Sequence, residues 1–263
     1  MRSITVGSAI LAALLAVSPG AGADEDAGSA GGATTVSAAD FAGTWAQLRV
    51  LTAVVDIPVL GRVKVTTTAV IRMAMSGSGR NLEISGQACS IEQEMDTSLL
   101  RSVFPEGLAR HAGRFESTAS LRVEDGEIRF FQPRRWLIFG ARLDDPEHEE
   151  LPTDPDDERV VDSDRDGKPG VTVHFEGLAS GDVYLVQRQW STMRGVADGD
   201  RIDGSIQWGE ERSVLDATSV LLKTSPPSRP DSDPSSSYFR MTRVGEDDDC
   251  AAILAERDTL FAR

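Results

Sequence analysis

The segment from Asp162 to Gly167 has residue types and a spacing that could bind a metal ion. It reads Asp-Ser-Asp-Arg-Asp-Gly, so Asp162, Asp164 and Asp166 are each separated by one residue. Ca²⁺ is a hard cation that takes about six to eight oxygen ligands, and three carboxylates on one bend can supply several of them. Gly167 allows a sharp bend because it has no side chain to obstruct the turn. The segment therefore predicts calcium as a bound cofactor.

The rest of the loop departs from the helix-flanked EF-hand pattern. Counted from Asp162 as the first position, Lys168 stands at the seventh, where only the backbone carbonyl is needed. Val173 stands at the twelfth, where that pattern requires a bidentate glutamate. Pro169 and β-branched residues also replace the exiting helix. The motif resembles instead the calcium loops that lie between strands of extracellular β-proteins.

Such a loop needs a further ligand from outside the motif. Glu176 lies a short distance downstream, and we include it in the predicted metal site with the three aspartates and Lys168. With few fixed carboxylates, the expected dissociation constant is about 10⁻⁴ to 10⁻³ M, the range of extracellular modules. An ordinary acidic turn is the alternative, because Asp and Gly both favour turns. The other candidates for the missing ligand are Asp156, Asp157, Glu158, Asp200 and Asp203.

The predicted site forms the end of an acidic segment that spans residues 144–170. The first part of this segment, residues 144–158, contains nine Asp or Glu residues and three prolines. Such a composition cannot bury enough apolar surface to form a core, so we expect a solvated loop.

The elements that position this loop are predicted to be β-strands. From Arg62 to Met75 apolar and polar residues alternate, and residues 115–123 repeat the pattern before Asp125-Gly126. Alternation with a period of two indicates strands with one buried face, and Asp-Gly favours a hairpin turn. Further strands are expected at residues 45–55, 82–92, 128–131, 136–143, 171–176, 183–190, 202–208, 214–222 and 238–244.

This pattern predicts an all-β fold, an antiparallel barrel or sandwich of about ten strands. Helix is confined to short turns within residues 98–111 and to a short C-terminal helix at 249–261. No sequence repeat divides the strands, so we expect a single β-rich domain at residues 40–263.

The two cysteines, Cys89 and Cys250, are predicted to form a disulfide. Cysteines present in an even number in a secreted chain usually pair. The bond would join the C-terminal helix to the strand at 82–92. Two separate thiols are the alternative.

Residues 1–23 have the features of a secretory signal peptide. Arg2 precedes an apolar stretch, and Ala21-Gly22-Ala23 is a small-residue cleavage site. The stretch is short for a membrane span, although a retained anchor is the alternative. Residues 24–39 are rich in Gly, Ala and Ser and predict a flexible, low-complexity lead. We expect a secreted or periplasmic protein with no membrane anchor after signal cleavage.

The acidic composition restricts the partners. The formal net charge is -15, which argues against nucleic acid and anionic membrane surfaces, because like charges repel. The same charge favours divalent cations. Protein partners are not indicated by any motif.

The first predicted strand begins with Gly43-Thr44-Trp45. This G-x-W pattern, together with the strand-rich plan, resembles the start of the first barrel strand in lipocalins. The resemblance implies a cup-shaped barrel that holds a small apolar ligand, with Trp45 as a ligand-binding residue near the closed end. An ordinary core tryptophan at the start of a strand is the alternative.

Two functions are open on the sequence alone. The first is a secreted, non-enzymatic calcium-binding β-barrel module that could carry an apolar ligand. The second is an extracellular hydrolase that uses carboxylates from the acidic loops, the paired-carboxylate chemistry of glycoside hydrolysis. We favour the first because the chain contains no HExxH, CxxC or GxSxG motif and no legible catalytic constellation.

Overall fold

The computed structural model describes residues 36–262 apart from 58–59, 106 and 112–113. They belong to a compact unit that extends from Thr34 to Arg263. The predicted signal peptide and residues 24–35 of the predicted lead lie outside the described residues.

The last residues of the predicted lead are part of the fold. The Ser37 hydroxyl accepts a hydrogen bond from the Ala39 N–H and caps a short 3-10 helix. Ala38 in this helix is fully buried. Residues 37–39, which lie before the expected boundary at Asp40, are therefore part of the fold.

Strands form most of the described chain, and every pairing between them is antiparallel. The elements in chain order are η1 (Ala38–Phe41), β1 (Gly43–Ile57), β2 (Gly61–Ser78), β3 (Asn81–Met95), β4 (Leu100–Val103), α1 (Gly107–His111), β5 (Arg114–Glu124), β6 (Glu127–Phe139), β7 (Val171–Gly177), β8 (Gly181–Asp198), β9 (Arg201–Ala217), η2 (Val220–Leu222), β10 (Ser228–Pro230), β11 (Tyr238–Arg243), α2 (Cys250–Ala255) and α3 (Arg257–Leu260).

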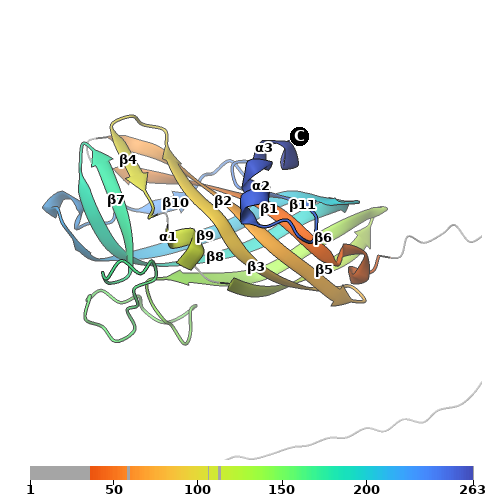
Figure 1. The fold of residues 1–263 in the computed structure, drawn as a ribbon. Helices are drawn as coiled ribbons and strands as arrows, with labels where there is room; N and C mark the ends of the chain where they lie inside the picture. The colour runs from red at the N-terminus through yellow and green to blue at the C-terminus, as the bar shows by residue number, and fades with distance from the viewer. Residues whose placement is uncertain (1–35, 58–59, 106, 112–113, 263) are drawn as a thin grey trace, which may run out of the picture. The chain divides into compact units, whose positions relative to one another are not determined.

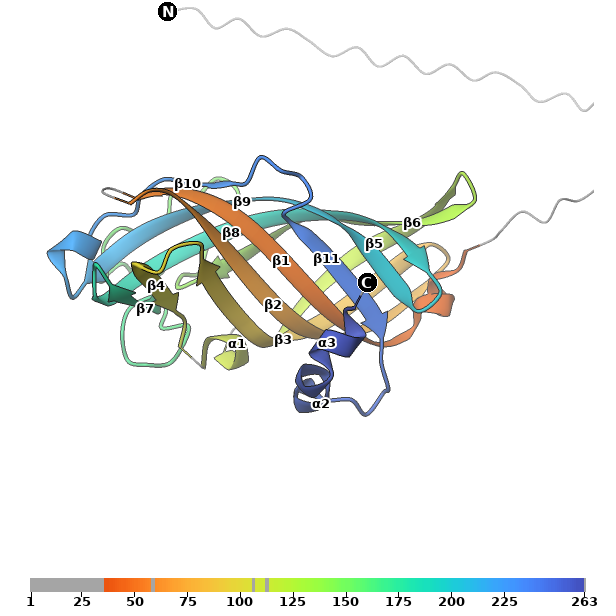
Figure 2. The same cartoon turned by 90° about the horizontal axis from the view of Figure 1, so that it is seen from above.

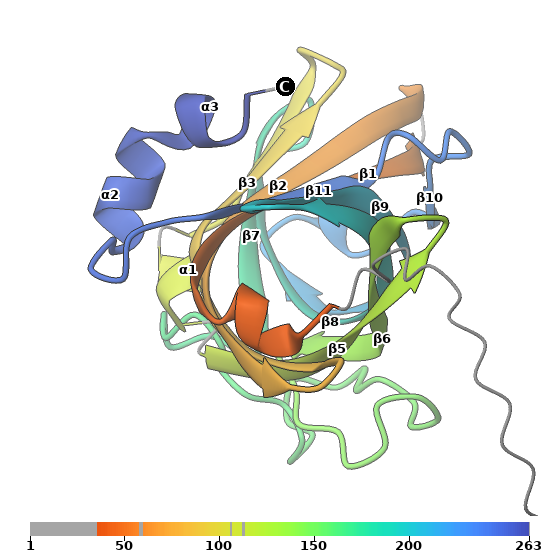
Figure 3. The same cartoon turned by 90° about the vertical axis from the view of Figure 1, so that its right-hand side faces the viewer.

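The sheet closes on itself into a barrel. Its strand order runs β8-β6-β5-β3-β2-β1-β11-β9, and a further ladder joins β9 back to β8. Figure 3 shows this ring from one end, with η1 at the near opening. The all-β prediction is confirmed, and the closed ladder makes the architecture a barrel.

The barrel has two sections along its axis, because two long strands each receive two shorter partners on one edge. On β1, β11 pairs with residues 45–50 and β10 with residues 53–55. On β8, β6 pairs with residues 187–197 and β7 with residues 181–185. β4 then pairs with β7, and Figures 1 and 2 show these two strands at the end of the barrel away from the β5–β6 turn.

The strand predictions differ from the structure in three places. The strands expected at 128–131 and 136–143 are one strand, β6, with a register shift between Gln132 and Arg135. Pro133 lies in this irregular stretch, where its missing N–H costs no ladder bond. The strands expected at 202–208 and 214–222 are also one strand, β9, which ends at Ala217 and is followed by η2. The short strands β4 and β10 were not predicted, because three or four residues are too few to show alternation.

Apolar side chains from all around the ring fill much of the barrel interior. The core includes Val63, Val65, Ile71 and Met73, which confirms the inward face predicted for β2. Trp45, Phe130 and Phe239 are the largest fully buried side chains.

A second apolar cluster lies outside the barrel, beneath the C-terminal helices. Ile253 and Phe261 pack there against Leu48 and Val70, which are on the outward face of β1 and β2. Figure 3 shows α2 and α3 on the outside of the ring. The predicted C-terminal helix is confirmed, although it is divided between α2 and α3.

The predicted disulfide between Cys89 and Cys250 is confirmed, with the two Cα atoms 5.1 Å apart. Ile71 pairs with Ala88 and Val70 with Ser90, so Cys89 is the extra residue of a bulge in β3. Cys250 is the first residue of α2. In the described ranges, no helix is long and apolar enough to cross a membrane.

Candidate metal centre in the loop before β7

The acidic segment between β6 and β7 is fixed to the barrel wall at its base and at its middle. Ala141 and Val160 form an isolated antiparallel bridge, and the Val161 N–H donates to the Gly140 carbonyl at 2.9 Å. Leu151, from the middle of the segment, is buried against Val186 and Leu215 of the barrel. The expectation of a wholly solvated loop is therefore wrong, because an apolar side chain anchors it between exposed carboxylates.

The carboxylates of Asp162, Asp164 and Asp166 meet in space as predicted. One oxygen of each lies within 4.8 Å of the others. Asp164 is only 5% exposed, while Asp162 and Asp166 are exposed. The three residues thus form an acidic cluster with one buried member, and this cluster could hold a metal ion.

Backbone N–H groups orient Asp162. Its Oδ1 accepts hydrogen bonds from the N–H of Arg165 at 2.6 Å and of Asp166 at 3.2 Å, and its Oδ2 accepts one from Gly167 at 2.9 Å. Arg165 and Gly167 both have positive φ angles, of 61° and 82°. The resulting tight turn wraps the chain around the Asp162 carboxylate, and Gly167 has the role that the sequence indicated.

The other two carboxylates are tied to the start of β7. Asp164 Oδ2 accepts the Thr172 N–H at 2.8 Å, and Asp166 Oδ2 accepts the Thr172 hydroxyl at 2.5 Å. Asp166 Oδ1 also accepts the Lys168 N–H at 2.8 Å. Because a carboxylate oxygen has two lone pairs, these bonds leave acceptor capacity for a cation.

Burial and hydrogen bonds act in opposite directions on the pKa values of Asp162 and Asp164. Burial raises the pKa of Asp164, and the nearby negative charge of Asp166 adds to that effect. Burial also acts to raise the pKa of Asp162, but the hydrogen bonds from Gly167, Arg165 and Asp166 outweigh it and hold that pKa below its usual value. A divalent cation would relieve the repulsion that crowds these carboxylates.

The structure does not bring the predicted Glu176 into the cluster. Its carboxylate lies 3.8 Å from Arg101 Nη1 and 4.0 Å from His174 Nε2, on the exposed side of β7. Lys168 follows the cluster directly, and its Nζ lies 5.9 Å from the centre of the Tyr184 ring.

Three of the five other carboxylates considered for the missing ligand have cationic partners elsewhere. Asp157 pairs with Arg159 at 2.7 Å, Asp200 with Arg243 at 2.6 Å, and Asp203 lies 3.8 Å from Arg240. Among the described residues the acidic cluster therefore has three members.

Trp45 is fully buried beside η1. Its Nε1 donates to the Phe41 carbonyl at 3.0 Å, its ring stacks on Phe41, and Arg243 covers it at 4.7 Å. These contacts account for the whole Trp45 side chain as part of the barrel core beside η1. A role for Trp45 in ligand binding stays a prediction.

Two residues that were not predicted from the sequence, Arg49 and Arg135, lie inside the barrel. A signal was present for Arg49, because Trp45, Gln47, Arg49 and Leu51 occupy alternate positions of one strand and must share a face. The same face that buries Trp45 therefore buries a guanidinium.

No protein-family model matches the chain, and no curated protein matches it either.

Proposed function

We propose that this protein is a secreted or periplasmic, non-enzymatic β-barrel module that binds one calcium ion in the loop before β7. The observation that carries this proposal is the convergence of Asp162, Asp164 and Asp166 within 4.8 Å. All three groups offer oxygen, which suits a hard cation, whereas zinc favours nitrogen and sulfur ligands.

Calcium fits this loop better than magnesium does. Magnesium demands a near-ideal octahedron, while calcium tolerates irregular sets of ligands and completes its shell with water. The Lys168 carbonyl would add a further protein ligand, as the sequence pattern predicts. With three carboxylates and no bidentate glutamate, the expected dissociation constant is about 10⁻⁴ to 10⁻³ M.

The expected role of the ion is structural. The loop joins the end of β6 to the start of β7, and β7 in turn carries β4. An ion that neutralises the three aspartates would hold these strands in place. A calcium concentration ten times the dissociation constant would stabilise the native state by about 1.4 kcal/mol. This corresponds to a rise in Tm of about 3–6 °C.

Secretion is supported by the disulfide between Cys89 and Cys250, because such bonds persist in oxidising compartments. The signal peptide predicted at residues 1–23 would deliver the chain there. The apolar ligand and the alternative of a hydrolase stay untested predictions.

Calorimetric titration of the chain without residues 1–23 tests the calcium site. Wild type should bind one calcium ion, and Asp164→Asn should bind at least tenfold more weakly, because one buried carboxylate charge is lost. Asp154→Asn is the matched control, since Asp154 lies in the same acidic segment and its exposed carboxylate accepts only the Asp156 N–H. This control should bind as wild type does.

Two results would refute the proposal. One is no saturable binding by the wild type up to about 10 mM calcium, well above the expected range. The other is equal affinity in the wild type and Asp164→Asn. A magnesium titration should give weaker binding than the calcium titration. Melting temperatures measured in calcium and in chelator should differ only for variants that retain the site.

A further inference from the structure

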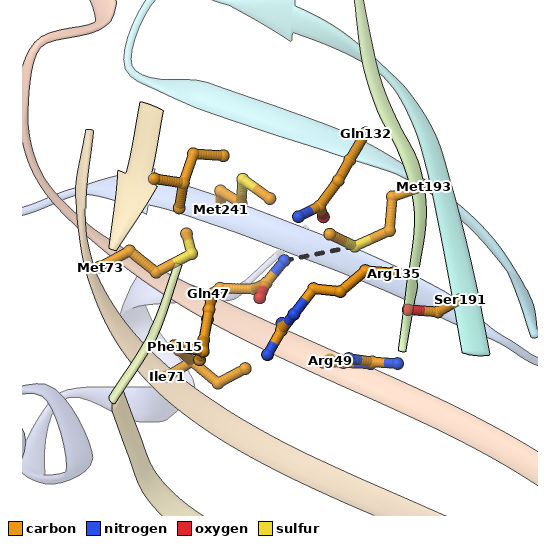
Figure 4. Close-up of a pocket in the computed structure, with 11 residues that line it drawn as sticks. Gln47, Arg49, Ile71, Met73, Phe115, Gln132, Arg135, Ser191, Met193 and Met241 are labelled. Carbon is orange, nitrogen blue, oxygen red and sulfur yellow. Dashed lines mark hydrogen bonds between the residues drawn. The ribbon is translucent and has the colours of Figure 1, made fainter. Parts of the chain in front are cut away.

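A buried arginine, Arg49, and a half-buried one, Arg135, face one small cavity inside the barrel. The cavity is lined by residues of β1, β2, β3, β5, β6, β8 and β11, and its charged members are Arg49 and Arg135. Figure 4 shows their side chains among those of Gln47, Phe115 and Ser191. The cavity volume is about 10 Å³, which is enough for one water molecule.

Neither arginine has the partners that a buried guanidinium needs. Arg49 is 8% exposed; its Nη2 donates to Gln189 Oε1 at a long 3.4 Å, and its Nε has no hydrogen-bond partner. Arg135 packs with its guanidinium carbon 3.9 Å from the centre of the Phe115 ring. Within the described part of the chain, no carboxylate pairs with either residue.

Glu210, which lies across the ladder from the partner of Arg49, is already neutralised. Gln189, the partner of Arg49, pairs across the β8–β9 ladder with Glu210. Glu210 forms a close ion pair with Arg212, and it also accepts hydrogen bonds from Ser228 at 2.8 Å and Gln187 at 2.9 Å. Its charge is therefore committed to Arg212 and does not offset Arg49 and Arg135.

The two guanidinium groups stay charged at neutral pH. Burial lowers the pKa of Arg49 to about 10, helped by the positive charge of Arg135, and burial lowers the pKa of Arg135 to about 10. Both values are well above neutrality. Two like charges without a counter-ion in a protein interior are costly, so the interior favours an anion.

We propose that the barrel interior binds a small oxyanion, a carboxylate or a phosphate, between Arg49 and Arg135. Planar guanidinium groups donate paired hydrogen bonds to such anions. Gln47 and Ser191 line the same cavity and can donate further bonds.

The site requires side-chain movements that enlarge it, because its volume is that of a single water molecule. The movable lining residues include Met73, Met193 and Met241, and methionine is flexible and adapts its shape readily. A free anion and the head group of a short amphiphile share this chemistry. An amphiphile would also place its chain against the apolar lining residues Ile71 and Ile84. The site shares no residue with the calcium loop.

Titrations with sodium acetate, sodium phosphate and sodium octanoate test the proposal, at a constant ionic strength set by sodium chloride. At least one of them should bind saturably to wild type and raise its Tm. Arg49→Met should bind at least tenfold more weakly. It should also melt at or above the wild-type temperature without added anion, because a buried unpaired charge is removed.

Two further variants complete the test. Arg135→Met, which removes the other cationic side chain that lines the cavity, provides an independent measurement if Arg49→Met does not fold. Arg194→Met is the matched control, because Arg194 is exposed on the outer face of β8 and covers Phe131 at 4.5 Å. Its anion affinity should equal that of wild type.

The ligands distinguish the sources of the anion. Binding of acetate or phosphate with an affinity similar to that of octanoate supports a free anion, and octanoate binding at least tenfold tighter supports an amphiphile. Absence of saturable binding of all three at about 20 mM would overturn the proposal and leave ordered water as the partner of the arginines. Equal binding in wild type, Arg49→Met and Arg135→Met would overturn it too.

Discussion

Replacing Cys89 and Cys250 together with alanine should destabilise the protein mainly through its unfolded state. The disulfide closes a loop with a sequence separation of 161 residues. In the chain-entropy description, a loop of this length restricts the unfolded chain by about 5 kcal/mol. The free energy of unfolding of the double variant should therefore fall by up to about 5 kcal/mol, a large share of the total for one domain.

The folded state should change much less. Ile253 and Phe261 bury their side chains against Leu48 and Val70 without help from the disulfide. We therefore expect α2 and α3 to stay docked in the double variant. Amide exchange over residues 250–260 should remain slow under native conditions.

Urea unfolding followed by tryptophan fluorescence measures the predicted loss. The dependence of the free energy on urea should also become steeper, because an unfolded chain without the cross-link exposes more surface. Ile253→Ala, with the disulfide intact, is the comparison. It should cost about 2–4 kcal/mol through the cavity it leaves, without a steeper urea dependence.

A loss below about 1 kcal/mol in the double variant would refute the chain-entropy reasoning. So would rapid exchange of the helical amides, because it would show that the disulfide holds α2 in place and the apolar cluster does not.

The remaining predictions concern the loop and its surroundings. Gly170→Ala should lower stability by more than about 1 kcal/mol, because Gly170 has φ of 82° and a Cβ would lie 2.4 Å from the Leu185 carbonyl oxygen. Gly199→Ala, at φ of 56° in open space, should cost less, and equal melting temperatures for the two variants would contradict this account. Asp157 should make the stability of the protein depend on pH in the acid range, since hydrogen bonds from Arg159 lower its pKa from 3.8 to about 2. A lowered pKa stabilises the folded state above pH 3.8, and this contribution is lost as the pH falls toward 2. Acid titration followed by near-ultraviolet circular dichroism should show a flatter decline for Asp157→Asn, and identical acid profiles would argue against the role of Asp157.

Local sequence patterns determined the strands and the acidic cluster. Side chains of an extended chain alternate between faces, so the pattern in residues 62–75 predicted which side of β2 is buried. The spacing of Asp162, Asp164 and Asp166 brought their carboxylates together within one turn, because all three lie within a few residues. The tight turn at Gly167 is also specified locally, because its positive φ favours glycine.

Long-range pairing decided what the sequence could not. Glu176 is near the aspartates in sequence, but as part of β7 its carboxylate faces Arg101 of β4. The short strands β4 and β10 exist because longer strands offer them unpaired edges, and no pattern of their own specifies them.

Ring closure also decided the character of the barrel interior. The alternation in β1 shows that Arg49 shares a face with Trp45, and this much is available from the sequence. That Arg49 meets Arg135 depends on the register of β6 with β8 and on the shift beside Pro133. Strand registers and barrel closure are fixed by contacts between residues far apart in the chain. A local pattern therefore predicts which side chains face inward but does not predict which residues they contact. Local patterns in the sequence thus determined the longer strands and the acidic turn, while the tertiary structure alone placed two positive charges on one cavity.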